Sequence, residues 1–113
     1  MKKRALALIL VFAFALGITA FAAEQATGIE PNLIFDGTTA HCSVLVTDIG
    51  STINATAALY YGSTKLASWS NSGTHTVFAG GTYTVVRGNT YLLVVYGDVD
   101  GDPFYDTMVS TCP

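Results

Sequence analysis

The stretch Ile53-Asn54-Ala55-Thr56-Ala57-Ala58-Leu59-Tyr60-Tyr61 decides the fold class. Apolar side chains recur at every second position, and a β-strand sends alternate side chains to opposite faces. The inward set is Ile53, Ala55, Ala57 and Leu59, and Tyr60 points away from it. A helix is disfavoured because the stretch is short, lies between Gly50 and Gly62, and has no stabilising charge pairs. Residues 53–61 therefore predict a half-buried strand.

Two further segments support the same class. In residues 40–48, Cys42, Val44 and Val46 share one face, with Leu45 as the apolar exception on the other. Residues 91–96 are apolar on both faces, which is typical of a central strand covered on each side, and they predict the middle of the core. Weaker strand patterns occur at residues 33–35, 65–70, 75–79, 83–86 and 104–111.

Turn residues separate these segments. They are Asp36-Gly37, Gly50-Ser51, Asn71-Ser72-Gly73, Gly80-Gly81, Gly88-Asn89 and Gly101-Asp102. Roughly seven or eight short strands in one small domain predict an all-β fold, a two-layer antiparallel β-sandwich of the immunoglobulin-like kind. A small β-barrel made of the same strands remains the alternative, because periodicity does not separate the two.

The first residues are typical of an exported protein. Basic residues 2–4, an apolar run from Ala5 to Leu16 and the small residues Ala20 and Ala22 form the three parts of a signal peptide. We expect residues 1–22 to be removed, residues 23–31 to form a flexible lead-in, and residues 32–113 to form the β-domain. An uncleaved membrane anchor is the alternative, since Ala5 to Ala23 approaches the ~20 apolar residues that span a bilayer. The expected location is secreted and extracellular, without a stable membrane anchor.

Charge excludes several classes of partner. Without the leader, the cations Lys65 and Arg87 face eight acidic residues, which leaves a formal charge of −6. Binding of nucleic acid needs clustered Lys and Arg, and docking on anionic lipid needs a basic patch. We therefore expect neither partner.

Cys42 and Cys112 are the two cysteines of the chain. In an exported protein of this size, such a pair predicts a disulfide. Closing a loop of about 70 residues contributes roughly 4 kcal/mol in the chain-entropy model. The sequence therefore predicts a Cys42–Cys112 bond that stabilises a small core.

One family shows a similar arrangement of residues. Cys42 in an early strand, Leu59-Tyr60-Tyr61-Gly62, Lys65-Leu66-Ala67-Ser68-Trp69-Ser70 and Gly88-x-x-Tyr91 before a terminal strand resemble small secreted proteins of gut Firmicutes. That family is of uncharacterised function, and the resemblance implies an immunoglobulin-like or fibronectin-III-like domain. In such a sandwich, Tyr91 would form a tyrosine corner with nearby backbone. Cys112 departs from the immunoglobulin pattern, because it lies in the last strand.

Catalytic residues are not expected. His41 and His75 are the two histidines, each among Ser and Thr in a predicted strand, without a Gly-x-Ser-x-Gly elbow. A zinc site would need three or four ligands, and the chain does not supply them near one another. The prediction is therefore no enzyme and no cofactor, and an exported hydrolase is the least favoured reading.

Two groups of residues are candidates for binding. Exposed aromatic rings could bind a protein or a glycan, and the candidate platform is Tyr60, Trp69, Tyr96 and Tyr105. The alternative is that these rings pack in the core or at strand edges. Closely spaced carboxylates could hold Ca²⁺ weakly, and the candidates are Asp98, Asp100, Asp102 and Asp106. The alternative there is a solvated hairpin loop, since Pro103 and Val109 break the calcium-loop pattern.

The predicted function follows from these features. We expect a secreted, non-enzymatic interaction or adhesion-type module that binds an extracellular protein or glycan. The alternative is a carbohydrate- or calcium-dependent binding module.

Overall fold

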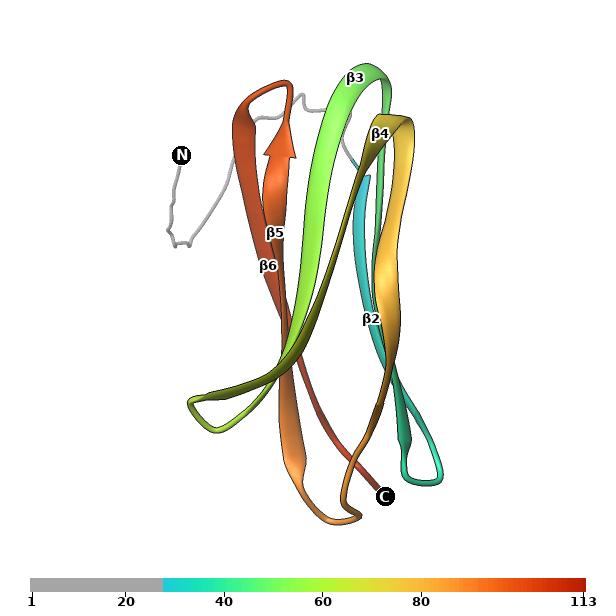
Figure 1. Cartoon of the computed structure of the whole chain (residues 1–113), viewed down its shortest axis with the longest axis vertical. Coiled ribbons are helices and arrows are strands. Elements are labelled where there is room, and N and C mark those ends of the chain that lie inside the picture. The colour runs from blue at the N-terminus through green and yellow to red at the C-terminus, as the bar shows by residue number, and fades with distance from the viewer. Residues whose placement is uncertain (1–27) are drawn as a thin grey trace.

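The computed structural model describes residues 28–113, which form five antiparallel strands (Figure 1). They are β2 (Gly28–Asp36), β3 (Thr39–Tyr61), β4 (Thr64–Thr84), β5 (Thr90–Val99) and β6 (Asp102–Thr111). The expected signal peptide, residues 1–22, and residues 23–27 lie outside the described residues. Within residues 28–113 no helix has the length and hydropathy to cross a membrane. The expected all-β class is confirmed.

The strands form one sheet with the order β2-β3-β5-β6, and β4 pairs with β3 beside this path. β3 and β4 are long enough to bend over at one end of the molecule, so that the sheet curls into a half-barrel (Figure 1). The β2 half of the sheet contains β2, residues 39–48 of β3 and residues 75–84 of β4. The β5 half contains residues 52–61 of β3, residues 64–74 of β4, β5 and β6.

Several predicted turns lie inside strands. The predicted strands 40–48 and 53–61 are one strand, β3, with a bend at Gly50-Ser51. The predicted turns 71–73 and 80–81 are continuous parts of β4. At Gly81 the glycine serves close packing: a Cβ atom there would lie 2.7 Å from Cε2 of Trp69. The sequence predicts a turn at this glycine, but the glycine instead leaves room for the Trp69 indole to pack against the backbone.

Two hydrogen-bonded residues hold the corner of β3, which we define as residues 48–52. The Gly50 amide donates to Nδ1 of His75 at 2.7 Å, and the Thr52 amide donates to Oδ1 of Asp100 at 2.8 Å. His75 and Asp100 have φ angles of 69° and 51°, in the left-handed region that non-glycine residues seldom occupy. β4 and the β5–β6 hairpin therefore both hold the corner at which β3 passes from one half to the other.

β2 begins earlier than the sequence predicts. Residues 28–31, assigned to the lead-in, pair with β3 from Gly28 opposite Thr47 to Pro31 opposite Val44. Pro31 hid this strand, because proline lacks an amide and argues against a central strand. β2 is an edge strand paired only with β3, and an edge position accepts proline.

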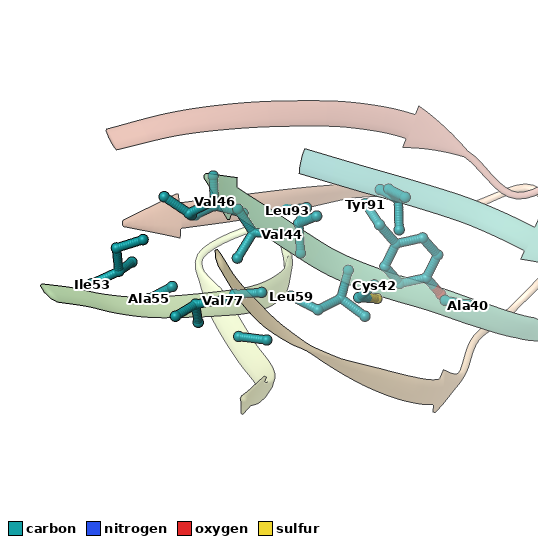
Figure 2. Packing of buried hydrophobic residues seen from close by; sticks show 14 of the residues in the cluster. Ala40, Cys42, Val44, Val46, Ile53, Ala55, Leu59, Val77, Tyr91 and Leu93 are labelled. Carbon is teal, nitrogen blue, oxygen red and sulfur yellow. The ribbon is translucent and has the colours of Figure 1, made fainter. Parts of the chain in front are cut away.

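The core lies between the two halves of the curled sheet (Figure 2). The inward set predicted for residues 53–61 is confirmed, since Ile53, Ala55, Ala57 and Leu59 are buried. Tyr91 lies at one end of the core, where its ring centroid is 5.4 Å from that of Tyr61. Its phenol oxygen accepts a hydrogen bond from the Val86 amide at 2.9 Å. The backbone bond expected of a tyrosine corner is therefore present.

The cysteines differ from the prediction. Cys42 and Cys112 are free thiols, both buried at 1% exposure. Sγ of Cys112 lies 3.4 Å from the carbonyl oxygen of Gly37, in the turn between β2 and β3. Cys42 lies further along β3, opposite Leu33 and Gly81. The predicted disulfide is therefore absent from the structure.

We expect both thiols to resist alkylation in the folded protein. Burial raises the pKa of Cys42 to about 11, and the thiolate is the reactive form, so little of it exists near pH 8. Mass spectrometry after iodoacetamide treatment should show slow labelling in buffer, and labelling at both sites in denaturant without reductant. An unlabelled chain in denaturant would show that the two sulfurs are joined.

Candidate functional site

The outer face of the β5 half carries an apolar and aromatic surface that we call the tyrosine face. It consists of Tyr60, Leu92, Val94, Tyr96, Tyr105 and Val109. Register places these residues in rows across three strands: Tyr60 lies opposite Leu92, Leu92 opposite Val109, and Tyr96 opposite Tyr105. All of them alternate with inward residues such as Leu93 and Val95, which are fully buried.

The tyrosine face is open to solvent. Tyr105 is 70% exposed, Val109 64% and Tyr96 40%, while Tyr60, Leu92 and Val94 are half-buried. The sequence predicts that residues 91–96 are covered on both faces, and this is wrong for the outer face. The inner face packs in the core, but no strand of the described chain covers the outer one. Apolar side chains that usually signal a second layer therefore meet solvent here.

Polar pairs border the tyrosine face on three sides. Nδ2 of Asn54 donates to Oδ1 of Asp98 at 3.1 Å, beside Tyr96 on the same face. Oγ1 of Thr56 lies 2.7 Å from Oγ of Ser70 on the β4 side. At the opposite end, Oγ1 of Thr90 lies 2.7 Å from Oγ1 of Thr111. These cross-strand bonds help to hold neighbouring strands in register.

The β5–β6 turn sets which aromatic residues meet. Asp100 and Gly101 form a two-residue loop with φ angles of 51° and 88°. Positive φ at both positions is the signature of a type I′ turn, for which Asp-Gly is a preferred sequence. The tight turn places Val99 opposite Asp102, and the register that follows places Tyr96 opposite Tyr105. A shift of the turn by one residue would have sent Tyr105 to the inner face.

Three of the four predicted platform residues share the tyrosine face. Tyr96 and Tyr105 lie directly opposite each other, whereas Tyr60 lies further along the same face, opposite Leu92. Trp69 does not join them: it pairs with the inward residue Ala57 and packs, half-buried, against the core. The sequence also missed Leu92, Val94 and Val109 as members of the surface. The available signal was in β5, where Leu92 and Val94 alternate with the apolar inward residues of the same strand.

The predicted calcium ligands do not converge. Asp98 lies on the outer face, bonded to Asn54, whereas Asp106 pairs with Val95 on the inner side of β6. Asp100 lies at the corner, where it accepts a hydrogen bond from the Thr52 amide. No three His, Cys, Asp or Glu side chains in residues 28–113 form a group that could hold a metal ion. The stretch forms a hairpin, the alternative that its turn residues allowed.

Asp106 is an inward-pointing carboxylate on an edge strand. Partial burial raises its pKa, although a hydrogen bond from the Thr107 amide to Oδ1, at 2.8 Å, acts in the opposite direction. Inward charges on edge strands are a common defence against strand-to-strand aggregation. The position is thus explained by protection of the β6 edge, at some cost to stability when the carboxylate is ionised.

We expect Asp106→Asn to raise the melting temperature at neutral pH. The folded-state pKa is above the unfolded value of about 4, so this group's stabilisation is complete below pH 4 and is lost as pH rises through the folded pKa. Asparagine keeps the acceptor for Thr107 and removes the titration. Thermal melts from pH 3 to pH 7 should show that the melting temperature of Asp106→Asn exceeds that of the native domain by an amount that grows with pH. A difference in melting temperature that does not change with pH would contradict this prediction.

The two histidines lie apart from one another. His75 accepts the Gly50 amide at the corner, so its Nδ1 has a structural role. His41 pairs with Ile34 and Thr82 on the outer face of the β2 half. Asp48 lies opposite His75 in the pairing of β3 with β4, beside the corner.

Comparison of the chain with protein-family models, with curated proteins and with solved structures found no match.

Proposed function

We propose that this protein is a secreted, non-enzymatic interaction module that binds a protein or a glycan outside the cell through the tyrosine face. The observation that carries the proposal is the open outer face of the β5 half, where Tyr96 and Tyr105 stand side by side in register and exposed. Export is supported by the leader-like sequence of residues 1–22.

The chemistry of the face suits binding. Tyrosine offers a large contact area with only two side-chain torsions to immobilise, and its hydroxyl remains available for a hydrogen bond. Aromatic residues are enriched at interfaces, and contiguous exposed apolar surface marks interaction sites. The three hydrogen-bonded borders keep the strands from adjusting, which lowers the entropy that binding must overcome.

The proposal includes an immunoglobulin-like arrangement of the sheet. If β3 and β4 are each divided at the corner, the sheet has seven strands in two layers. β2, the first part of β3 and the second part of β4 form one layer. The second part of β3, the first part of β4, β5 and β6 form the other. The hydrogen bond between the Val86 amide and the Tyr91 phenol supports this arrangement, since it has the form of a tyrosine corner. The tyrosine face would then be the outer surface of the four-stranded layer.

A displayed library of random peptides and a glycan array test the proposal together. The native domain should retain ligands that Tyr96→Ser/Tyr105→Ser loses by about tenfold or more, as expected for central aromatic contacts. Phe78→Ser is the matched control, because Phe78 is 57% exposed on the outer face of the β2 half. Melting curves must show that both variants fold. Equal retention by native and double-variant domains would refute the proposal.

A further inference from the structure

We infer that the occupant of the tyrosine face is a protein segment carrying arginine or lysine side chains, a conclusion that rests on the proposed function above. Two features of the face lead to it: the carboxylates of Asp98 and Asp100 at the end that carries the tyrosine pair, and the apolar rows that continue away from this end.

Negative charge is concentrated at one end of the face. Asp98 follows Tyr96 by two residues on the same side of β5, which is about 7 Å along a strand. Asp100 lies in the turn that joins β5 to β6, whereas Asp102 lies opposite the buried Val99 and belongs to the inner side of β6. The two cations of residues 28–113 lie away from this end: Lys65 pairs with Tyr60, and Arg87 donates to the Pro113 carbonyl at 3.0 Å.

These carboxylates can receive a cation without giving up their structural bonds. Asp98 uses Oδ1 for Asn54 and Asp100 uses Oδ1 for Thr52. Among residues 28–113 these bonds do not use Oδ2 of either carboxylate, and each Oδ2 can meet a ligand. The faces of the Tyr96 and Tyr105 rings attract the same charge through cation–π contact. A guanidinium or ammonium group seated beside the tyrosine pair would therefore meet both kinds of favourable interaction.

The rest of the face favours a polypeptide. From Tyr60 through Leu92 to Val109 the surface is apolar and spans three strands. A free small cation would leave these rows exposed, and a nucleic acid or acidic polysaccharide would be repelled by the carboxylates. A protein segment with basic residues at one end and apolar residues at the other covers both parts.

The experiment uses peptides recovered from the displayed library, synthesised and titrated against the native domain. We expect the enriched peptides to carry Arg or Lys, and their affinity to fall when salt is raised from 0.05 M to 0.5 M. Asp98→Asn and Asp100→Asn should each weaken binding about two- to fivefold, the factor that corresponds to an exposed charge pair. Asparagine at position 98 keeps the acceptor for Asn54. Asp36→Asn, in the β2–β3 hairpin away from the face, should leave affinity unchanged.

The outcomes separate this inference from the proposed function. If the tyrosine double variant loses binding but the enriched peptides are neutral or acidic, the face binds ligands and the cationic partner is wrong. Salt-independent binding of a neutral glycan that requires both tyrosines would overturn it in the same way. If the tyrosine double variant binds as well as the native domain, the proposed function itself fails.

Discussion

Gly97→Ala is expected to destabilise the domain by about 2 to 3 kcal/mol, the upper part of the range for overpacking. A Cβ atom at this position would collide with the Asn54 carbonyl oxygen and lie 2.8 Å from its carbon. The ring of Phe104 stands on the other side, with Cζ at 3.0 Å. Because two of these atoms are backbone, β5 would have to move away from β3. Urea unfolding followed by circular dichroism measures the loss.

Gly28→Ala is the matched control for this substitution. Gly28 is also a strand glycine, but its nearest neighbour for a Cβ atom is the Thr47 carbonyl oxygen at 4.0 Å. We expect a change within about 0.5 kcal/mol, as is usual for an unobstructed surface site. Similar losses for both variants would show that strand glycine in general, and not the close approach of β5 to β3, sets the effect.

Gly81→Ala is expected to displace the Trp69 indole and cost about 1 to 3 kcal/mol. The new methyl group would collide with Nε1 and lie 2.7 Å from Cε2 of the ring. The indole packs partly buried against the core, so its displacement should expose it to water. Since the chain has one tryptophan, a red shift of its emission reports this site alone.

Gly73→Ala serves as the control for the fluorescence experiment. Its Cβ atom would meet only Cγ2 of Val77, at 3.3 Å, and the Thr76 carbonyl oxygen, at 3.7 Å. A small side-chain adjustment accommodates the first contact, so we expect little change in emission. An unshifted spectrum for Gly81→Ala would contradict the packing of Trp69 against that glycine.

The alternation of apolar and polar residues predicted the all-β class and the inward residues of β3. It could do so because a strand with one buried face has an apolar residue at every second position. Strand ends were harder to predict. Gly80 and Gly81 have the composition of a turn, yet they allow β4 to pack closely against Ser43 and Trp69. A glycine selected for the absence of a side chain and one selected for positive φ are the same letter in the sequence.

The candidate site was predicted in part, for a reason that register explains. Tyr60, Tyr96 and Tyr105 were recognised as aromatic residues able to form a platform, but which of them share a face depends on the turn at Asp100-Gly101. That dipeptide was available as a hairpin signal. The open outer face of β5 could not be predicted, because whether an apolar face is covered depends on the path of every other strand.

The β3–β4 hairpin is joined by the two residues between Tyr61 and Thr64, so its strands can begin to pair early in folding. Closing such a small loop has a low entropic cost, so pairing can start at Tyr61 opposite Thr64 and proceed toward the corner. The register shift between Asp48 and Thr52 then fixes the alignment of the second part. Because this hairpin runs through both halves, neither half can separate without breaking it, and the domain should unfold as one cooperative unit.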